Sequence, residues 1–475
     1  MKSLERTLWE AADKLRKNLD AGEYKHIVLG LIFLKYISDG QWSYLKDRAK
    51  DGDPGIVKKI AGAMEEIEKM NPTLQDIFPR EYFRPHLDPQ NLGQLIDLID
   101  SISGCPGDAN NNNTDLLGKV YEYLLGCFAM DEGKKSGQFY TPPCIVKLLV
   151  EMLMPFKGSV YDPCCGSGGM FVQVENFLLA HQGRLDDIAI YGQESNAAAH
   201  RLCRMNLAIR GLDAANIQWN NQGSFLNDAH PHLKADYILA NPPFNDSDWN
   251  GQRLTNDPRW QLGIPPNHNA NFAWLQHIVY HLSPVGTAGV VLANGSLTTQ
   301  NKNEEPIRKK MVENGIVECI VSLPDRLFYN TGIPACLWFL ANNEKQKKGP
   351  ASQILFIEAR FLGRMISRRY RELTDDDIDA VAGVYHRWRD SDSQYEDIPG
   401  FCKSAQLKDI IHQEYLLTPA RYVGIAGAEE KEDNIIPFKQ KIKQLAKEFT
   451  ILIKRGEEVD RVIMEGLKNI ELLEE

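Results

Sequence analysis

Asn241-Pro242-Pro243-Phe244 is the stretch of sequence from which the fold and the function can be worked out. It follows Ala235 to Ala240, a short apolar run that predicts a buried β-strand. Two consecutive prolines cannot continue the hydrogen-bond ladder of a strand, so the chain must turn away from the sheet here. In an open α/β sheet, the carboxyl end of a strand lies at the edge where ligands bind. We therefore expect these four residues to line a ligand site.

The side chains of this stretch suit a flat ring that carries an amino group. The Asn241 amide oxygen and a proline carbonyl can each accept one hydrogen of an exocyclic amine. Phe244 offers an aromatic face on which the ring can stack. Taken alone, the stretch is equally compatible with a Pro-Pro turn capped by asparagine, so a second signal is needed.

The second signal is a predicted strand that ends in a glycine-rich turn. Ser159 to Tyr161 is followed by Asp162-Pro163-Cys164-Cys165-Gly166-Ser167-Gly168-Gly169. Glycines let the backbone approach a ligand closely, but this pattern is neither the dinucleotide fingerprint nor a P-loop. A carboxylate at the strand tip attracts an ammonium group and repels a pyrophosphate, which favours a ligand with an amino-acid end. Cys164 and Cys165 have no second pair at zinc-ligand spacing, which disfavours a metal site.

A third polar group ends the next predicted strand, Ile188 to Glu194. Glu194 is placed to accept hydrogen bonds from ribose hydroxyls, and a solvated acid at a strand end is the alternative. Two carboxylates and an amine receptor at neighbouring strand ends describe a site for two ligands. One ligand carries an ammonium group and a ribose, and the other is a planar amine. This combination matches S-adenosylmethionine and an adenine or cytosine base.

Helices are expected before the sheet. Apolar residues recur at spacings of three and four, which predicts helices over residues 3–50, 56–70 and 91–103 and no strand before about residue 155. We expect an all-helical N-terminal domain over residues 1–112, with a structural cap as its simplest role and a DNA clamp or a subunit contact as alternatives. The asparagine-rich loop 108–113 is interpreted as its boundary.

Residues 113–425 are expected to form a catalytic domain of the α/β class. A helix over 114–130 leads to Gln138-Phe139-Tyr140-Thr141-Pro142-Pro143, where Thr141 is the predicted N-cap of a helix over 143–154. Strands and helices then alternate, as in a doubly wound sheet. The further elements that we expect are helices over 195–210, 269–282 and 304–314 and strands over 216–219, 287–293, 315–323, 334–340 and 353–357.

Residues 426–475 are expected to form a C-terminal helical tail after an acidic linker at 426–434. The tail carries a coiled-coil-like seam that contacts another subunit or folds back on its own domain. The seam consists of apolar residues at spacings of four and three: Ile442, Leu445, Phe449, Leu452, Val459 and Ile463, following Phe438.

Composition limits the partners of the chain. A formal charge of −10 means that any contact with DNA must be local or shared with a basic partner. Nine cysteines without a paired framework predict reduced thiols in a cytosol. The start of the chain lacks a signal-peptide core, and no apolar run approaches the ~20 residues of a membrane span. We expect a cytoplasmic protein that does not contact a membrane.

Two basic clusters are interpreted first as solvated faces and second as DNA contacts. The first cluster is Lys302, Arg308, Lys309 and Lys310, and the second is Arg364, Arg368, Arg369 and Arg371. The second is the better DNA candidate because Tyr370 lies within it.

The motifs, taken in their order along the chain, resemble those of the N(6)-adenine DNA methyltransferases. More narrowly, the chain resembles the modification subunit of a type I restriction–modification system, over nearly its whole length. The resemblance implies a Rossmann-like, S-adenosylmethionine-dependent sheet that methylates the exocyclic amine of adenine in DNA. It also implies a bacterial or archaeal cell, a specificity subunit that selects the DNA target, a restriction subunit, and a second copy of this chain as partners.

The resemblance further assigns residues to roles. Asn241 and Pro242 hold the adenine amine, Phe244 stacks on the flipped base, and Pro243 completes the motif. Asp162 lies near the methionine ammonium, and Glu194 binds the ribose. The cofactor pocket is lined by Gln138, Phe139, Tyr140, Thr141, Pro142, Pro143, Gly166, Ser167, Gly168 and Gly169. Where the family often has an Asp or Asn before a Ser or Thr, this chain has Gln222-Gly223-Ser224, and Asn221 or Ser224 takes that contact with the cofactor adenine.

Two other functions compete with this interpretation. A protein-glutamine methyltransferase would also suit an Asn-Pro-Pro-aromatic stretch, but the motif at residues 138–142 and the helical N-terminal domain argue against it. A non-catalytic scaffold in a DNA complex is disfavoured by the intact Asn241 and Asp162. The DNA target sequence and the stoichiometry of the complex cannot be read from this chain.

Overall fold

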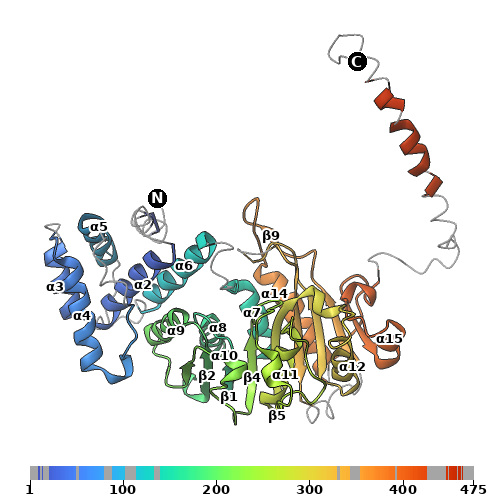
Figure 1. Cartoon of the computed structure of the whole chain (residues 1–475), viewed down its shortest axis with the longest axis horizontal. Helices are drawn as coiled ribbons and strands as arrows, with labels where there is room; N and C mark the ends of the chain where they lie inside the picture. Colours follow the sequence, from blue (N-terminus) through green and yellow to red (C-terminus); the bar gives the residue numbers. More distant parts are fainter. Residues whose placement is uncertain are drawn as a thin grey trace. The chain divides into compact units, whose positions relative to one another are not determined.

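The computed structural model divides the chain into two compact units, Met1–Gly424 and Ile425–Glu475 (Figure 1). The residues that the structure describes are 9–10, 13, 21–49, 53–79, 88–101, 114–132, 140–328, 332–342, 353–390, 393–424, 446–447, 449–456, 458–461 and 463. The predicted domain boundary at 108–113 lies outside these residues, as do Gln138 and Phe139. No helix within the described ranges is both long enough and apolar enough to cross a bilayer.

Helices form the N-terminal part of the first unit, as predicted. In the described residues before the sheet there is no strand, and the helices are α2 (Ala21–Ile37), α3 (Asp39–Ala49), α4 (Ile56–Met70), α5 (Pro89–Asp100) and α6 (Thr114–Glu132). They bury a core of their own that includes Ile32, Trp42, Ile60 and Leu95. The period of the apolar residues places α4 and α5, each of which buries one face, whereas α2 is buried on nearly all sides from Ile27 to Lys35.

A nine-stranded sheet forms the centre of the rest of the first unit. The strands lie in the order β11-β8-β6-β7-β5-β4-β1-β2-β3. Their bounds are β1 (Gly158–Asp162), β2 (Ile188–Glu194), β3 (Ile217–Trp219), β4 (Ala235–Ala240), β5 (Leu282–Ala293), β6 (Val317–Ser322), β7 (Ala335–Ala341), β8 (Gln353–Glu358) and β11 (Cys402–Gln406).

The sheet is mixed rather than wholly parallel. Strands β3, β2, β1, β4 and β5 pair in parallel, whereas β7 is antiparallel to both β5 and β6. The connection from β6 to β7 has no helix in its described part, and antiparallel neighbours need no crossover helix. Strand β11 adds an antiparallel edge to β8. The prediction of a doubly wound sheet is therefore confirmed for the parallel half, and β7 and β11 depart from it.

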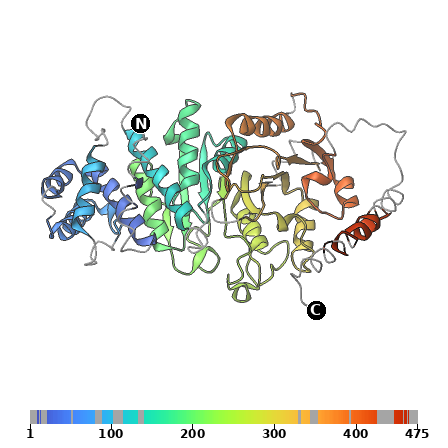
Figure 2. The same ribbon diagram turned by 90° about the horizontal axis from the view of Figure 1, so that it is seen from above.

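Helices cover both faces of the sheet. The remaining helices are α7 (Pro143–Leu153), α8 (Gly169–Ala180), α9 (Ala197–Ile209), α10 (Gly223–Leu226), α11 (Asn271–His281), α12 (Glu305–Glu313), α14 (Asp375–Arg389) and α15 (Leu407–His412). One core holds side chains of α7, α8 and α14, and the other holds side chains of α11 and α12. Figure 2 shows α14 and α11 on opposite sides of the strands. Adjacent residues of β1 belong to different cores, Val160 to the first and Tyr161 to the second, as the pleat requires.

Helix α9 joins the N-terminal helices to the sheet. Its residues Cys203 and Leu207 belong to the core under the sheet, whereas Leu202, Met205 and Ile209 belong to the core of the N-terminal helices. The helical cap and the sheet therefore share one element, and the cap is packed onto the sheet.

The prediction that the first basic cluster is a solvated face is partly wrong. Lys302, Lys309 and Lys310 are exposed, but Arg308 is 1% exposed and donates to the carbonyl oxygens of Tyr415 (2.9 Å) and Thr299 (2.7 Å). A buried guanidinium needs such acceptors because its charge cannot be left unsolvated. Arg308 thus ties α12 to the chain after α15.

The second unit is described over part of the predicted tail. Residues 449–456 are helical, and Phe449, Leu452, Val459 and Ile463 of the predicted seam are exposed. Phe438, Ile442 and Leu445 lie outside the described residues. Contact of this seam with another subunit stays a prediction.

Candidate active site

A cavity of about 540 Å³ opens at the carboxyl edge of the sheet. It lies between the turn after β1, the end of β2, the loop after β3 and the turn after β4. The predicted site residues that line it are Tyr140, Gly166, Ser167, Glu194, Asn221, Asn241 and Pro243. Parts of the chain that are far apart in sequence therefore meet at this one edge. The size is typical of pockets that bind small molecules.

Asn241 is held at the cavity by one side of its amide group. Its Nδ2 donates to Thr141 Oγ1 at 2.8 Å. Its Oδ1 is buried and accepts no hydrogen bond from the residues that the structure describes. A buried acceptor without a donor is unfavourable by about 1–3 kcal/mol. The oxygen is thus oriented and free to accept a hydrogen bond from a ligand.

Thr141 has a role that differs from the predicted one. Pro142 is the N-cap of α7, and no side chain caps this helix end. The Thr141 hydroxyl instead accepts the Asn241 amide hydrogen, so the prediction of Thr141 as N-cap is wrong. Pro143 does occupy the first helical turn, as predicted.

Phe244 and Pro242 lie beneath the surface of the site. The Phe244 ring is 9% exposed and packs edge-on against Phe328, with the ring centroids 5.6 Å apart. Neither Phe244 nor Pro242 is among the residues that line the cavity. Stacking of Phe244 on a flat ring stays a prediction.

The glycine-rich turn is fixed to the end of β2 by Glu194. The Glu194 carboxylate accepts from Gly166 N (2.9 Å) and Asn196 N (2.8 Å) and lines the cavity. Gly168 has φ +82° and starts α8, and a Cβ placed there would lie 2.9 Å from Cys203 Sγ. A side chain at this position would be strained by both its backbone angle and its packing. Gly168 and Gly169 therefore shape the turn without lining the cavity.

Asp162 is the carboxylate that was predicted at the strand tip, and it is more deeply buried than expected. It is 2% exposed, does not line the cavity, and accepts from Cys164 N at 3.0 Å. Burial raises the pKa of Asp162 to about 7, the hydrogen bonds from Cys164 oppose that rise, and the nearby Glu194 charge adds to it. No cation pairs with Asp162 among the described residues. Contact with an ammonium group stays a prediction, and such a contact would lower this pKa.

The loop after β3 contributes Ser224, a predicted contact, and Phe225, which belongs to an aromatic group that the sequence analysis missed. Ser224 Oγ donates to the Pro163 carbonyl oxygen at 2.6 Å, so its hydroxyl joins this loop to the turn after β1. Phe225 lies against Trp274 of α11 with ring centroids 4.3 Å apart, and Trp249 also packs on Phe225. These three rings form an aromatic wall of the cavity. Only the chain's fold brings them together, because they are far apart in sequence and follow no motif.

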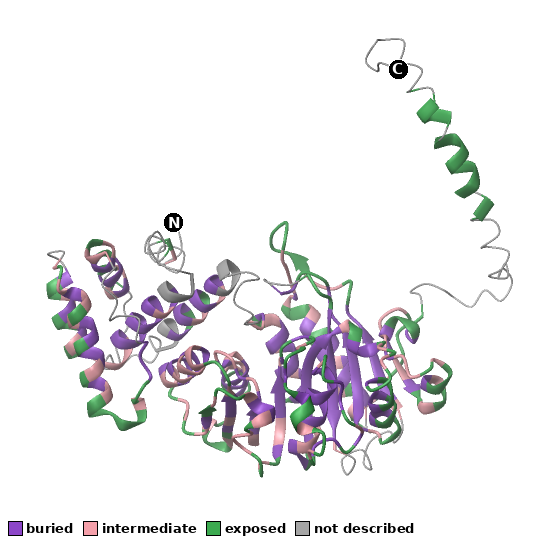
Figure 3. Ribbon diagram, in the orientation of Figure 1, coloured by how far each residue is buried: buried purple, intermediate pink, exposed green. Residues whose placement is uncertain are grey.

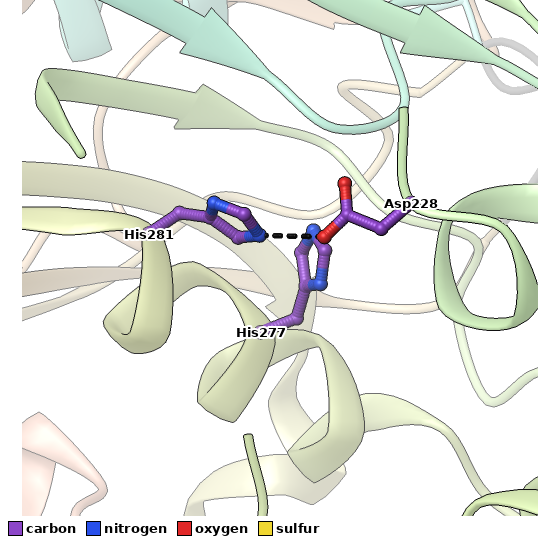
Figure 4. A group of neighbouring side chains, drawn as sticks. All are labelled: Asp228, His277 and His281. Carbon is purple, nitrogen blue, oxygen red and sulfur yellow. Dashed lines mark hydrogen bonds and ion pairs between the residues drawn. The ribbon is translucent and has the colours of Figure 1, made fainter. Parts of the chain in front are cut away.

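Asp228, His277 and His281 form a buried cluster behind this wall (Figure 4). His281 donates from Nε2 to Asp228 Oδ2 (2.8 Å) and from Nδ1 to the Leu233 carbonyl oxygen (3.0 Å). Both ring nitrogens of His281 are therefore engaged in hydrogen bonds. Burial opposes ionisation of Asp228, but the His281 hydrogen bond and the nearby positive charges hold the pKa of Asp228 well below its usual range.

Arg259 supplies further positive charge to this cluster. Its Nη1 lies 3.0 Å from His277 Nδ1 and 3.9 Å from Asp228 Oδ2. Arg259 also donates to the carbonyl oxygens of Ser224 (3.3 Å) and Phe225 (2.6 Å). A metal ion here would have to displace a guanidinium, which disfavours the metal function even though the residue types are suitable. The cluster instead fixes the loop that forms the aromatic wall.

Two family profiles match the sequence. The profile described as N-6 DNA Methylase matches residues 112–433, and the profile described as HsdM N-terminal domain matches residues 4–41. The first covers the sheet and the cavity, and the second covers the first helices of the N-terminal part.

Relatives and a solved structure agree with these profiles. The type I restriction enzyme HindI methylase subunit of Haemophilus influenzae is 45% identical, over 87% of this chain and 92% of the relative. The type I restriction enzyme MjaIX methylase subunit of Methanocaldococcus jannaschii is 35% identical, over 98% of this chain and 90% of the relative. The crystal structure of a type I restriction–modification methyltransferase subunit from Streptococcus thermophilus superposes with a TM-score of 0.74 at 25% identity, covering 89% of this chain and 99% of that one.

Proposed function

Because the chain belongs to the N-6 DNA methylase family as a methylase subunit of a type I restriction enzyme, we propose that the cavity is where it methylates the exocyclic amine of adenine in DNA. The observation that carries the assignment of the site is the Asn241 oxygen, which is buried and unpaired within the described part of the chain. It lies where β4 ends, beside the glycine-rich turn.

The adenine amine is held by two acceptors. One hydrogen is donated to Asn241 Oδ1 and the other to the Pro242 carbonyl oxygen. The amine is a weak nucleophile because its lone pair is delocalised into the ring, and these two hydrogen bonds favour the form in which the lone pair stays on nitrogen. The Thr141 hydroxyl keeps the amide turned so that its oxygen, rather than its nitrogen, faces the base. Orientation supplies much of the rate, and no strong base is required.

The residues around the cavity fit S-adenosylmethionine. Glu194 presents a carboxylate whose orientation is set by two backbone N–H groups, which suits ribose hydroxyls. The aromatic wall of Phe225, Trp249 and Trp274 offers flat apolar faces, which suit an adenine ring. Asp162 supplies negative charge under the turn, which suits the methionine ammonium. When bound, S-adenosylmethionine supplies a methyl group that is activated by the sulfonium.

The remaining assignments of the pocket follow the same logic. Tyr140, Ser167 and Asn221 line the cavity and contact the cofactor, and Asn221 takes the polar contact with its adenine, because the Ser224 hydroxyl is used by Pro163. Gln138 and Phe139 immediately precede Tyr140 and complete this wall in our proposal. Pro142, Pro143, Gly166, Gly168 and Gly169 shape the backbone around it.

The partners in our proposal are those of a type I complex. A specificity subunit selects the DNA target, a restriction subunit acts on unmodified DNA, and a second copy of this chain modifies the other strand. The tail over 426–475 contacts a partner subunit through its apolar seam. The cysteines that the structure describes are free thiols, which suits the cytoplasm of a bacterial or archaeal cell.

An Asn241→Ala variant tests the proposed site. Radiolabelled S-adenosylmethionine and unmethylated genomic DNA are supplied to the chain co-purified with its specificity subunit. We expect methyl transfer to fall by at least about 10²-fold, as for loss of one preorganised transition-state contact, while the Kd for S-adenosylmethionine is unchanged. The exposed Asn303→Ala is the matched control. Unchanged transfer by the Asn241 variant contradicts the assignment, and label found in protein rather than DNA supports a glutamine substrate.

A further inference from the structure

A basic β-hairpin extends from the carboxyl edge of the sheet. It consists of β9 (Arg364–Met365) and β10 (Arg371–Glu372), which pair antiparallel. The Tyr370 carbonyl oxygen accepts from Ile366 N (3.0 Å) and Ser367 N (3.3 Å), and this closes the turn. Figure 1 shows the hairpin, labelled at β9, standing clear of α14, and Figure 3 shows it as exposed. The tip consists of residues 366–370.

The hairpin carries positive charge that is not neutralised. Arg368 and Arg369 at the tip are exposed, and no carboxylate within the described ranges pairs with either of them. Arg364 is 71% exposed and makes a long 3.7 Å contact with Glu372. The rest of the chain is acidic enough to give a net charge of −10. A basic projection on an acidic protein is the local contact that an anionic partner requires.

Exposed apolar side chains accompany these arginines. Phe361 is 82% exposed, Ile366 is 50% exposed and Met365 is 43% exposed. Arginines and apolar side chains that are exposed together on a two-stranded ribbon are suited to a nucleic-acid groove, because the arginines contact phosphates while the apolar groups face sugars and base edges.

The hairpin is anchored beside the proposed target-base site. Arg371 N donates to the Arg326 carbonyl oxygen at 2.9 Å, and the Arg371 side chain lies 3.7 Å from Asp325. The same loop continues to Phe328, which packs on Phe244. Because β8 is parallel to β6, and β6 runs in the direction of β5 and β4, the hairpin leaves the sheet at the edge that carries Asn241.

A second contact ties the end of the hairpin to the same site. Helix α14, which follows β10, begins with Asp375, and Asp375 accepts from Lys147 of α7 at 2.7 Å. Helix α7 begins directly after Thr141 and Pro142, and Thr141 holds the Asn241 amide. Two contacts at the C-terminal end of the hairpin thus fix it to elements that position the catalytic stretch.

We propose that this hairpin binds the sugar–phosphate backbone of double-stranded DNA beside the target adenine, with Arg368 and Arg369 as the phosphate contacts. The proposal rests on the proposed function, because it takes DNA as the substrate of the adjacent site. The hairpin contributes affinity for DNA of any sequence. It does not take part in the chemical step.

The test compares three forms of the chain, each co-purified with its specificity subunit. They are the unchanged chain, Arg368→Ala/Arg369→Ala, and Arg368→Lys/Arg369→Lys, which keeps the charge. Lys309→Ala/Lys310→Ala is the matched control, since it removes two exposed charges from α12. The Kd for a fluorescent DNA duplex is measured over a range of salt concentrations, and methyl transfer is measured over a range of DNA concentrations.

Each neutralised phosphate contributes about 0.9 to the slope of log K against log salt. We therefore expect the alanine pair to reduce that slope by about 1.8, the lysine pair to preserve most of it, and the control to leave it unchanged. The alanine pair should also raise the KM for DNA, and the Lys309→Ala/Lys310→Ala control should leave methyl transfer unchanged.

Two results would overturn the proposal. One is an unchanged slope in the alanine pair, and the other is loss of assembly with the specificity subunit on gel filtration, which would make the hairpin a protein interface. Failure of the proposed function is a separate result, because the unchanged chain would then transfer no methyl group to DNA. The binding slopes still decide the role of the hairpin in that case.

Discussion

At the scale of single residues, the site depends on how one amide group is turned. Asn241 has a donor side and an acceptor side that differ little in shape, and only the acceptor side can receive an adenine amine. The Thr141 hydroxyl distinguishes them because it accepts from Nδ2. In the proposed site, Thr141 is thus a positioning residue that acts through Asn241.

Substitution of Thr141 tests this positioning role. Thr141→Val removes the hydroxyl and keeps the shape, so the amide loses its fixed orientation. A hydrogen bond of this kind contributes about 0.5–1.5 kcal/mol, and we expect kcat for methyl transfer to fall roughly tenfold. Thr141→Ser should restore most of it. Steady-state kinetics give the measurement, and an unchanged kcat in the valine variant would show that Asn241 orients itself.

Protonation of Asp162 should make cofactor binding depend on pH. With a pKa of about 7 in the free protein, Asp162 is mostly protonated at pH 6 and mostly ionised at pH 8. If the ionised form binds the methionine ammonium, binding at low pH must first release a proton. We expect the Kd for S-adenosylmethionine to be about tenfold higher at pH 6 than at pH 8.

Calorimetric titration over this pH range measures the effect. Asp162→Asn should bind weakly and with a flat pH profile, whereas the exposed Asp186→Asn should retain the profile of the unchanged chain. A Kd that does not vary between pH 6 and pH 8 would remove Asp162 from the ammonium site.

The residues that could be predicted at this scale are those whose chemistry is local. Asn241, Glu194 and the glycines follow strand ends, so a strand prediction already places them at one edge. The aromatic wall could not be predicted, because Phe225, Trp249 and Trp274 meet only through tertiary packing. The role of Thr141 was also missed, since its partner lies 100 residues further along the chain.

At the scale of elements, Arg210 joins α6 to α8. It directly follows α9, its side chain is 7% exposed, and it lies between Glu122 (3.1 Å) and Glu175 (3.4 Å). Burial raises the pKa of Glu122, and the Arg210 charge opposes that rise. This arginine therefore allows two buried carboxylates to face each other between helices.

Arg210→Ala should strongly destabilise the fold. It removes the cation that faces Glu122 and Glu175, and we expect the free energy of unfolding to fall by about 3–5 kcal/mol. Because a carboxyl whose folded-state pKa is raised loses stability as pH rises, the deficit should be larger at pH 8 than at pH 5. Urea unfolding at the two pH values measures this. Arg184→Ala, which removes an exposed pair with Asp186, should have no effect, and an equal loss in both variants would refute the role of burial.

The direction of a strand in the sheet could be predicted where the connection to the next strand allows only one arrangement. The positions of β1, β2 and β4 in a parallel sheet were predicted correctly, because predicted helices separate these strands and a parallel pair needs a crossover connection. The direction of β7 could not be predicted from its uniformly apolar residues, which suit either direction. Strand β11 is mostly polar, with two buried residues, and so it lacked a strand signal. The hairpin of β9 and β10 was interpreted only as a charge cluster.

At the scale of the whole molecule, α9 makes the first unit cooperative. One face of α9 belongs to the core under the sheet and the other to the core of the N-terminal helices. If α9 detached from either part, apolar surface of that part would be exposed. Arg204, on the same helix, donates to the carbonyl oxygens of Thr73 (2.6 Å) and Gln75 (3.0 Å) and strengthens the connection.

Truncation of each face of α9 tests this cooperativity. Met205→Ala creates a cavity among the N-terminal helices, and Leu207→Ala creates one under the sheet. Each should lower stability by about 2–5 kcal/mol, and both should shift the same thermal transition. Differential scanning calorimetry measures it. Two transitions, each sensitive to only one variant, would show that the cap and the sheet unfold independently.

The packing of Phe244 against Phe328 has a consequence for fidelity. In our proposal, a base that leaves the duplex and stacks on Phe244 enters beside Phe328, whose ring packs edge-on against Phe244. Phe328 belongs to the same loop as Arg326, whose carbonyl oxygen accepts from Arg371 N. The proposed entry of the base is thus coupled to this loop, and in our proposal DNA that does not keep its base extruded dissociates before it is modified.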